Sequence, residues 1–512
     1  MCYNNKKSEV KTMQTVVDVN TMRESDRQTI DSGVSGRELM WRAATGVLEA
    51  HPWGRRTAIV CGMGNNAGDG FALALLLQAN GKDCTVFTLS DRLSEDGGYY
   101  YEKCKENAVK IEKFGHKEDL RGFDTVVDCI FGTGCRGVAE GIFADAINAI
   151  NASGATVISV DINSGMNGDS GLGAPCVRSS LTVAIGFYKY GHFLGNAKDV
   201  IGRLRCVDIG IPLFGRAAEL VEREDLAPVF RTRLQNSHKG SYGYVSVLGG
   251  CASYAGAVKL ANMSAAALRT GCGVSQLIVP QGLSASVSPY LLESTLATLP
   301  DRNGYAAYAP DALDAALRNQ RALAIGMGWG RSDENFKILS HILRNYALSL
   351  VIDADAINCL SENDKSILKE TRCCVVLTPH AKEMERLCGK PMGEILADPV
   401  GTAENFAREY GVILLLKGAT TVVTDGDKTY LVNRGCAGMA TAGSGDVLSG
   451  VLVGLLGYTP CTPLTVACGA YLAGRAGELA ERDSNPISMT SSDTVAHLGA
   501  AVSEILAASK PL

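Results

Sequence analysis

The nine residues GMATAGSGD, at positions 438–446, join a run of small residues to an aspartate and then to an apolar segment, 447–456, that we expect to be helical. Glycines let a charged ligand approach the backbone closely, and the first turn of a helix offers unpaired N–H groups at the positive end of its dipole. Asp446 stands where phosphate chemistry needs a proton acceptor. A glycine-rich turn before a helix is more often structural, so the stretch predicts an anion site only if its neighbours agree.

The length and composition predict a large α/β protein with more than one domain. A chain of 512 residues is too long for one ordinary core, and two large domains suit it. It has 57 glycines, with 46% hydrophobic and 20% charged residues, which is typical of an enzyme with glycine-rich loops. The formal charge of -5 and the lack of Lys/Arg runs offer no attraction to a nucleic-acid backbone. We therefore expect no nucleic-acid partner.

The cysteines and the apolar segments indicate the compartment. The 17 cysteines include no C-x-x-C pair, and most lie within apolar runs, as small core residues do in a reducing compartment. No segment offers the ~18 uninterrupted apolar residues that a membrane span requires, and no apolar run follows the basic first residues. The sequence therefore predicts a cytoplasmic protein without a membrane partner.

Short apolar runs bounded by glycine loops alternate with helix-length segments in both halves. In the first half these runs are TAIVCGMG, CTVFTL, TVVDCIFGTG, TVISVDINSG, LTVAIGF and LRCVDIGIP. Such alternation predicts a parallel sheet with crossover helices, whose ligands collect at the carboxyl ends of the strands. A charged stretch separates this half from the strand at YVSVLGG. We expect a flexible N-terminus (1–11), a first domain (12–221) and a larger second domain (222–512).

The loop CGMGNNAGDG, residues 61–70, follows an expected strand and leads into a helix at FALALLLQANG. Its spacing differs from a Rossmann dinucleotide fingerprint. Asn65, Asn66 and Asp69 add amide and carboxylate groups, which a plain strand-to-helix turn rarely needs. The loop therefore predicts a binding site.

Further polar residues follow two other strands of the first domain. Asp128 ends one strand and Asp161 ends the next, with Ser164 close behind. The oxygens of Asn66, Asp128 and Ser164 suit a hard cation. Because the set contains so few carboxylates, it favours a monovalent ion. The aspartates could equally be helix N-caps. Lys189 could neutralise a phosphate, hold a charged base, or be an ordinary surface lysine.

At these residues the first domain resembles the NAD(P)H-hydrate epimerase family, whose pattern is a G-x-G-N-N-G-G-D-G loop, a V-D-x-x-F-G-T-G loop and a D-I-P-S-G loop. The match covers about residues 12–218 and implies a Rossmann-like three-layer domain with a parallel sheet. It implies that two loops contact the hydrated dinucleotide through Asn65, Asn66, Ala67, Gly68, Asp69, Gly132, Thr133, Gly134, Cys135, Arg136, Gly137 and Val138.

The same resemblance assigns chemistry to the strand ends. Asp161 would bind the hydrate and transfer a proton, with Lys189 as its catalytic companion, and Asn66, Asp128 and Ser164 would bind K+. The sequence departs from the family pattern at Ala67, where the family has glycine, and at Asn163, where the family has proline.

Loops after expected strands also gather polar groups in the second domain. Gly326 to Gly330 is one such loop, and Asp353 and Asp355 could organise another or face a magnesium-bound phosphate. His380 and Glu383 follow CVVLTP, where they could meet a polar substrate or begin a solvated helix. A lysine with small and hydroxyl residues, at 417–421, follows VILLL and suits a nucleotide phosphate.

Together with residues 443–446, these motifs resemble the ADP-dependent NAD(P)H-hydrate dehydratase family, a branch of the ribokinase-like fold, over about residues 226–510. The resemblance implies contacts to the hydrate from Ala257, Gly328, His380 and Asp446. It implies contacts to the adenine nucleotide from Lys417, Gly418, Ala419, Thr420, Thr421 and Gly445. The departure is HAKE at 380–383, where the family commonly has H-P-G-E.

The sequence thus predicts a bifunctional α/β repair enzyme for hydrated nicotinamide nucleotides. It would interconvert the R and S forms of NADHX and NADPHX and dehydrate the S form at the expense of ADP, with K+ and Mg²⁺, as a homo-oligomer, tetrameric or larger. Asp446 would be the catalytic base of the dehydratase. The alternative is an ATP-dependent kinase of a small alcohol fused to a ligand-sensing N-terminal module, because the Gly-x-Gly-Asp site alone would serve either.

Overall fold

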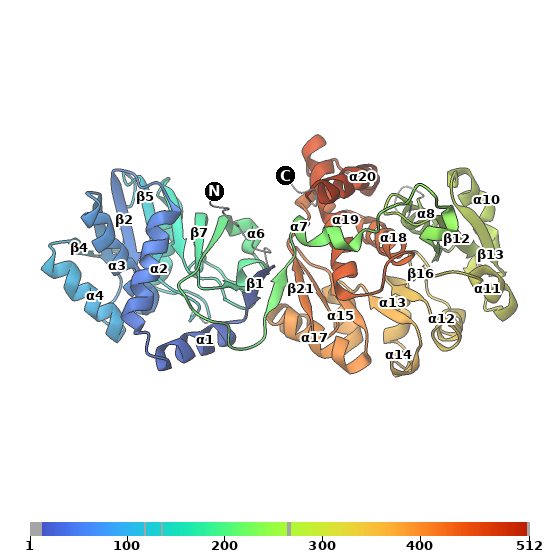
Figure 1. Cartoon of the computed structure of the whole chain (residues 1–512), viewed down its shortest axis with the longest axis horizontal. Helices are drawn as coiled ribbons and strands as arrows, with labels where there is room; N and C mark the ends of the chain where they lie inside the picture. The colour runs from blue at the N-terminus through green and yellow to red at the C-terminus, as the bar shows by residue number, and fades with distance from the viewer. Residues whose placement is uncertain (1–12, 117–118, 135–136, 264–267, 509–512) are drawn as a thin grey trace, which may run out of the picture. The chain divides into compact units, whose positions relative to one another are not determined.

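The computed structural model describes residues 13–116, 119–134, 137–263 and 268–508, so the N-terminus expected to be flexible, 1–11, lies outside the described residues. These residues form two compact units (Figure 1). One runs from Thr15 to Ala218, and the other begins at Glu219 and includes Met13 and Gln14. Within the described parts of the chain, no helix combines the length and the apolar character needed to cross a membrane.

The N-terminal unit is built on a seven-stranded sheet in which every pairing is parallel. From edge to edge its strands are β4 (Lys110–Lys113), β3 (Asp83–Thr88), β2 (Arg56–Cys61), β5 (Thr125–Cys129), β6 (Thr156–Val160), β7 (Ser179–Ile185) and β9 (Ile201–Val207). Strand β1 (Gln14–Val17) pairs in parallel with β8 (Tyr188–Lys189), outside this seven-stranded sheet. The expected parallel sheet is confirmed.

Helices cover both faces of this sheet because alternate strand residues point to opposite sides. Ile59 and Cys61 of β2 pack into one core, and Ala58 and Val60 pack into the other. The first core is closed by α1 (Val19–Asp31), α2 (Gly36–Ala50), α3 (Asn65–Ala79) and α4 (Glu95–Glu106), and the second by α5 (Ile142–Ala152). The short α6 (Ala197–Val200) completes a unit of three layers.

The C-terminal unit has a longer sheet, parallel except around one strand. In order its strands are β13 (Thr295–Leu299), β12 (Val274–Pro280), β11 (Tyr244–Leu248), β16 (Ala322–Ile325), β17 (Ser349–Ile352), β18 (Cys374–Leu377), β19 (Ile413–Leu416), β20 (Thr421–Thr424), β21 (Thr429–Val432) and β10 (Ala218–Leu220). Strand β20 is antiparallel to both of its neighbours. A two-stranded ribbon pairs β14 (Asp301–Arg302) with β15 (Tyr305–Ala306).

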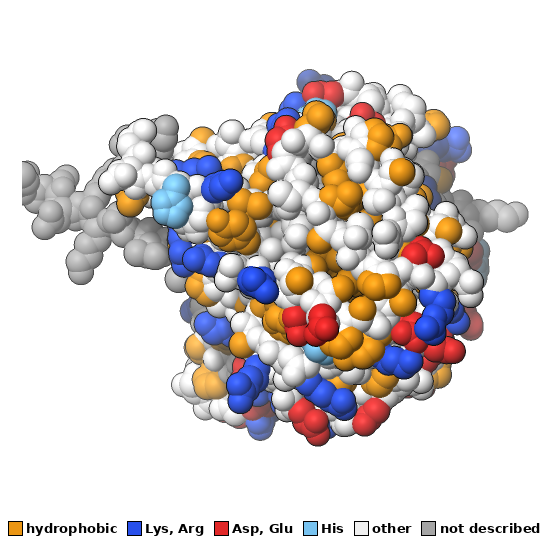
Figure 2. All heavy atoms as spheres, turned by 90° about the vertical axis from the view of Figure 1, so that its right-hand side faces the viewer, with side chains coloured by type: hydrophobic (Ala, Val, Ile, Leu, Met, Phe, Trp, Pro, Cys, Tyr) orange, Lys and Arg blue, Asp and Glu red, His pale blue; other side chains and the backbone are white. Residues whose placement is uncertain are grey.

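Two helix layers enclose this sheet (Figure 1). One layer contains α7 (Arg223–Leu226), α8 (Ala255–Asn262), α18 (Ser444–Leu456), α19 (Pro463–Asp483) and α20 (Ser491–Ala508). Helix α10 (Ser284–Val287) packs into the same core as α8. The other side and the sheet edge carry α11 (Pro310–Leu317), α12 (Asp333–Asn345), α13 (Asp355–Ser361), α14 (Ile367–Glu370), α15 (Ala381–Cys388), α16 (Met392–Ala397) and α17 (Pro399–Tyr410). Figure 2 looks onto the face with α11 and β13, where acidic and basic side chains are interspersed with apolar ones.

Two helices begin earlier than the sequence predicts. Helix α3 begins at Asn65, so the polar part of the 61–70 loop forms its first turns. Helix α18 begins at Ser444 rather than near residue 447, which places Asp446 inside its first turn. Glycine N-caps, Gly64 and Gly443, precede both helices without a side-chain cap, so the first N–H groups stay available to a ligand.

Candidate active sites

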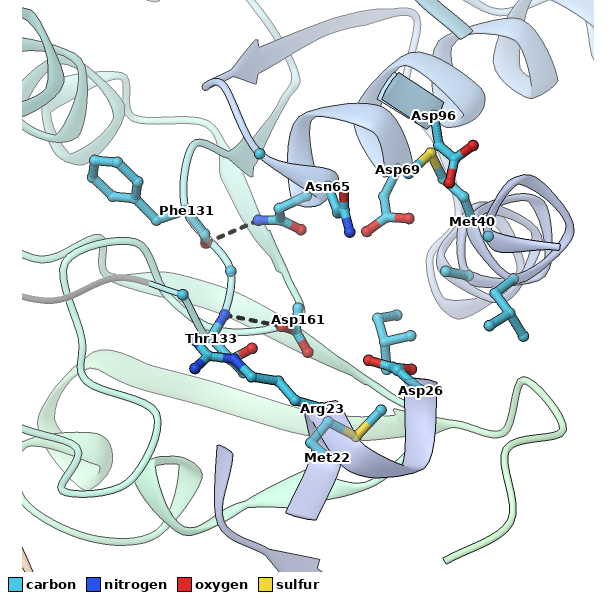
Figure 3. Close-up of a pocket in the computed structure, with 18 of the residues that line it drawn as sticks. Met22, Arg23, Asp26, Met40, Asn65, Asp69, Asp96, Phe131, Thr133 and Asp161 are labelled. Atoms are coloured by element: carbon cyan, nitrogen blue, oxygen red, sulfur yellow. Dashed lines mark hydrogen bonds between the residues drawn. The ribbon is translucent and has the colours of Figure 1, made fainter. Parts of the chain in front are cut away.

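The N-terminal unit contains a cavity of about 600 Å³ at the carboxyl ends of its strands (Figure 3). A volume of this size suits a small-molecule ligand. The predicted residues that line it are Asn65, Asn66, Asp69, Gly132, Thr133, Gly134, Val138, Asp161 and Lys189. Helices α1 and α2 supply further lining residues that no motif indicated: Met22, Arg23, Asp26 and Met40. The cavity therefore joins the predicted loops to a wall that sequence reasoning missed.

Some predicted contact residues do not line this cavity. Ala67 is fully buried in the core beside the sheet, so the methyl group that distinguishes it from the family's glycine adds to packing. Gly68 faces α2, where a Cβ would lie 2.4 Å from Met40 Sδ. Gly137 has a positive φ of 81° and is not a lining residue. Cys135 and Arg136 lie outside the described residues.

Asp161 and Lys189 form a buried ion pair at the cavity floor. Lys189 Nζ lies 2.5 Å from Asp161 Oδ1 and donates to the Ile185 carbonyl at 2.7 Å, and the lysine side chain is 1% exposed. Burial by itself would raise the pKa of Asp161, but the Lys189 ammonium outweighs it and holds that pKa below its usual value. Asp161 is therefore ionised at neutral pH, and its Oδ2 accepts from the Thr133 N–H at 3.3 Å.

His192 holds this pair in place, although no motif named it. Its Nδ1 accepts the Lys189 backbone N–H at 2.9 Å, so its Nε2 is the donor to the Asp161 carbonyl at 2.7 Å. Burial, with the Lys189 charge, lowers the pKa of His192 to about 4, so the ring is neutral. Asp161 has φ +66°, a left-handed conformation that costs a non-glycine residue energy, and this hydrogen bond helps to hold it.

Three further carboxyl groups, those of Asp26, Asp69 and Asp96, line the same cavity (Figure 3). Burial raises the pKa of Asp69 well above its usual value, and the charges of Asp161 and Asp26 raise it further. Burial also raises the pKa of Asp26 to about 6, against a lowering by Lys189. Asp69 therefore holds its proton more strongly than an ordinary carboxyl group, whereas Asp161 gives its proton up readily.

The predicted cation ligands lie together beneath the loop after β5. Asn66 Nδ2 donates to the Phe131 carbonyl at 2.9 Å, and Asn66 Oδ1 is buried with no hydrogen-bond partner. Ser164 Oγ accepts the Phe131 N–H at 2.9 Å and donates to Asp128 Oδ1 at 2.5 Å. Asp128 is fully buried, and burial raises its pKa. The oxygen atoms gathered here come from an amide, a hydroxyl, a carboxylate and a backbone carbonyl, and among the described residues no group of three or more His, Cys, Asp or Glu could hold a metal ion.

Asn163 replaces the family's proline by a network of hydrogen bonds. Its Nδ2 donates to the carbonyls of Val177 and Val200 at 2.9 and 3.2 Å and to Ser179 Oγ at 3.1 Å. Its Oδ1 accepts from Thr182 Oγ1 at 2.5 Å, and the side chain is fully buried. The amide therefore fixes the loop between Asp161 and Ser164 that a proline ring would otherwise restrain.

The second site lies at the carboxyl ends of β16 to β19 in the C-terminal unit. Lys417 directly follows β19, and its Nζ lies 2.9 Å from Asp353 Oδ1 and 3.8 Å from Glu383 Oε2. Ser449 Oγ of α18 donates to Asp353 Oδ2 at 2.7 Å. Burial would lower the pKa of Lys417, but the carboxylates of Asp353 and Glu383 outweigh it and raise that pKa. A fixed cation therefore stands beside the first turn of α18.

Asp446 lies in that same turn, where the charges of Lys417 and Asp353 act on it. Burial raises the pKa of Asp446 to about 7, the charge of Asp353 adds to the rise, and Lys417 opposes it. A Cβ on Gly445 would lie 3.6 Å from Lys417 Nζ and 3.7 Å from Asp353 Oδ2, so the helix backbone closely approaches the ion pair. The geometry gives a base poised near neutrality beside free helix N–H groups and a lysine.

His380 and Glu383 form a capping box at the start of α15. His380 Nδ1 accepts the N–H groups of Lys382 and Glu383 at 3.1 and 3.3 Å, and Glu383 Oε2 accepts the His380 N–H at 2.9 Å. The HAKE departure thus preserves a regular helix start. His380 remains about half exposed, with its Nε2 3.6 Å from Glu383 Oε2.

The remaining predicted residues of the second site lie in loops, in the turn after β19 and at the start of β20. Gly328, at φ +58°, packs against Ala257, since a Cβ there would lie 3.0 Å from the alanine methyl. Asp355 Oδ2 accepts the Gly330 N–H at 2.7 Å, so this carboxylate organises its loop. Thr420 is buried and donates to Asn433 Oδ1 at 2.9 Å. Gly418 and Ala419 form the turn from β19 to β20, and Thr421 is the first residue of β20.

The structure has two glycine-rich sites, one in each unit. Each site lies at the carboxyl ends of parallel strands and contains a buried lysine–aspartate pair. This arrangement defines a two-site α/β enzyme. The bifunctional NAD(P)H-hydrate repair enzyme Nnr of Moorella thermoacetica is 36% identical over 458 residues, covering 86% of each chain. Its counterpart in Escherichia coli strain K12 is 30% identical over 484 residues, covering 91% of this chain and 90% of its own. The chain belongs to the family of bifunctional NAD(P)H-hydrate repair enzymes.

The two halves also match separate families. Residues 35–191 match the YjeF-related protein N-terminus, and residues 245–498 match NAD(P)H-hydrate dehydratase. One similar solved structure is the ADP/ATP-dependent NAD(P)H-hydrate dehydratase of Bacillus subtilis, co-crystallised with ATP and Mg²⁺. Its sequence is 26% identical and its TM-score is 0.49, and the match covers 56% of this chain and 98% of that one.

Proposed function

We propose that this protein repairs hydrated NADH and NADPH in two steps. The N-terminal half, residues 12–221, interconverts the R and S epimers of the hydrate, and the C-terminal half, residues 222–512, dehydrates the S epimer at the expense of ADP. The observation that carries the proposal is the position of Asp446, a base with a pKa of about 7, at the open first turn of α18 beside Lys417. Family membership supports the same substrates.

In the dehydratase site, Asp446 takes the proton of the ring hydroxyl as that oxygen attacks the terminal phosphorus of ADP. The oxygen–phosphorus bond forms, the bond to the AMP oxygen breaks, and the N–H groups of residues 443–445 with Lys417 stabilise the transferred charge. Phosphate then leaves the ring carbon with its bonding electrons while a ring proton is lost, which restores the double bond. His380, Gly328 and Ala257 would contact the hydrate, and residues 417–421 the nucleotide.

Mg²⁺ would be bound with the nucleotide phosphates, since this ion keeps several waters and uses only one or two protein carboxylates. Asp355, whose charge acts on Asp446 and whose Oδ2 accepts the Gly330 N–H, would supply a carboxylate oxygen to the ion. The ion would neutralise phosphate charge there.

In the epimerase site, Asp161 removes the proton of the hydroxyl on the hydrated ring carbon during ring opening and returns it on closure. Lys189 keeps Asp161 ionised, and His192 fixes both groups. K+ would be held by Asn66, Asp128 and Ser164, because Asn66 Oδ1 is buried without a partner and every donor is oxygen. The ion would orient the loop after β5 and attract the substrate phosphates.

The first test follows the reduced-nicotinamide absorbance while the full-length protein acts on mixed NADPH-hydrate epimers with ADP, Mg²⁺ and K+. Complete recovery of NADPH is expected. Recovery that stalls with one epimer left would reject the epimerase assignment, and a stable phosphate ester in place of NADPH would reject the dehydratase assignment. Asp161→Asn should stop recovery from pure R epimer, and an unchanged rate would reject its role. Light scattering would check the expected tetramer or larger assembly.

A further inference from the structure

Asp26 stands on the wall of the epimerase cavity that no sequence motif describes. It lies on α1, one turn after Met22 and Arg23, and its carboxyl group faces the cavity together with those of Asp69 and Asp161 (Figure 3). Asp69 comes from α3 and Asp161 from the end of β6, so three separate elements bring carboxyl groups into one cavity.

No structural role explains the Asp26 carboxyl group. It is half-buried, yet it makes no hydrogen bond or ion pair with any residue that the structure describes. Other acids of the same helix have ordinary partners, since Glu24 binds Arg27 at 2.6 Å and Asp18 caps the helix through the Thr21 N–H. A partly buried carboxylate without a partner weakens a fold, so such a group in a cavity indicates a ligand.

Asp26, Asp69 and Asp161, three of the four aspartates that line the cavity, hold their protons with different strength. Lys189 keeps the pKa of Asp161 below its usual value, whereas burial raises the pKa of Asp69 well above its usual value. Burial raises the pKa of Asp26 to about 6, so Asp26 can both lose and regain a proton near neutrality. Groups whose environments separate their pKa values in this way are the expected acid and base of a site.

We propose that Asp26 is the second proton-transfer group of the epimerase, an inference that rests on the epimerase activity proposed above. As Asp161 takes the hydroxyl proton, the ring carbon–nitrogen bond breaks, its electron pair moves to nitrogen, and Asp26 gives that nitrogen a proton. The ring carbon becomes an aldehyde carbon and turns. On closure the nitrogen attacks the other face, its proton returns to Asp26, and Asp161 returns the other proton to the new hydroxyl group.

The test uses the full-length protein without ADP and measures the conversion of pure R epimer to S by chromatography. Asp26→Asn should lower kcat by roughly 10²- to 10⁴-fold, the range for loss of a general acid. Asp26→Glu should recover part of that loss because it restores a carboxyl group. Asp31→Asn is the matched control, because Asp31 is exposed on the same helix and should leave the rate unchanged.

Two readouts separate this role from a structural one. The wild-type rate should fall as pH rises above about 6 and Asp26 loses its proton, and Asp26→Asn should lack this alkaline fall. The raised pKa means that ionised Asp26 weakens the folded state above that pH. The Asp26→Asn protein should therefore melt at the same or a higher temperature than the wild type at pH 8. It should also keep full ADP-dependent dehydration of the S epimer.

An Asp26→Asn protein with wild-type epimerisation and an unchanged pH profile would overturn this assignment alone. A variant that loses stability together with activity would also overturn it, since it would show a structural carboxyl group. A wild-type protein that leaves pure R epimer unchanged would instead overturn the proposed epimerase function, and this inference with it.

Discussion

The surroundings of Asp446 set its strength as a base and, in the proposed function, would also bind a nucleotide. Lys417, which would attract phosphate, stabilises the ionised form of Asp446. Burial and the charge of Asp353 act in the opposite direction, and they prevail, which leaves the pKa of Asp446 at about 7. Replacing any of these neighbours would therefore change proton transfer as well as binding.

We predict that dehydration of pure S epimer with ADP rises with pH and levels off above about 7, because only ionised Asp446 accepts the hydroxyl proton. Below that value the rate should fall by about tenfold per pH unit. Asp446→Asn should lower kcat by about 10²- to 10⁴-fold. Initial rates from nicotinamide absorbance measure both effects, with Asp427→Asn, at an exposed turn, as the control. A rate independent of pH through neutrality would contradict the assignment of Asp446 as base.

Sequence reasoning could find Asp161, Lys189, Lys417 and Asp446 because each belongs to a motif that the resemblance covers. It could not find Asp26, because α1 carries charged residues at many positions and such a pattern is typical of a solvated helix. Only the packing of α1 against the cavity distinguishes Asp26 from its exposed neighbours.

At the scale of elements, α3 and α18 are the two helices on which the proposed binding depends. Both begin after a glycine with extended or left-handed backbone, Gly64 or Gly443, and both direct the N–H groups of the first turn to a site. Gly443 has φ +94°, and a Cβ there would lie 2.4 Å from Leu260 Cδ2. Gly445 is inside the helix and would meet only ordinary contacts. The two glycines of this loop therefore serve different purposes.

Alanine at these two glycines should separate stability from catalysis. Gly443→Ala should lower the free energy of unfolding by about 1–3 kcal/mol, because alanine is strained at positive φ. Gly445→Ala should keep or raise stability by up to about 1 kcal/mol, since alanine favours a helix. Its methyl group beside Lys417 would obstruct the phosphate, so kcat/KM for ADP should fall. Chemical denaturation and steady-state rates check this pair, and a stable, fully active Gly445→Ala protein would exclude close phosphate approach there.

The buried strands of the first half could be predicted from the sequence, whereas the edge strand β4 and the first residues of the helices could not. Each apolar run of the first half became a strand of the parallel sheet, because such runs are long and bounded by glycine loops. Strand β4 was missed because only Ile111 of its four residues is apolar. The sequence assigns Thr421, the first residue of β20, to a phosphate loop together with residues 417–420. Glycines at Gly445 and Gly68 concealed the first turns of their helices, because glycine usually opposes helix formation.

At the scale of the whole molecule, each site draws its residues from one unit. Every residue lining the first cavity falls between Met22 and Ile209, within the N-terminal unit. The lysine, carboxylates and glycines of the second site all follow Glu219. Each unit also has its own buried hydrophobic core. Neither site therefore needs a side chain from the other unit to complete its described geometry.

Mixing two inactive proteins should therefore restore full repair. Full-length Asp161→Asn should leave R epimer unconverted, and full-length Asp446→Asn should epimerise without dehydrating. Together, with ADP, they should convert all of a mixed-epimer sample to NADPH, because the S epimer can diffuse from one chain to another. The final absorbance measures completeness. A mixture that stalls would contradict separate sites, while single variants that are both fully active would contradict the residue assignments.

The residues of each site come from one continuous part of the chain, and this has a consequence for how the gene can evolve. A gene that encodes two self-contained sites can be divided, joined or recombined between them without dispersing either set of site residues. Selection can therefore act on one activity while the other is unchanged. Joining them in one reading frame has a different benefit, because translation then produces both sites in a fixed one-to-one ratio, whatever the level of expression.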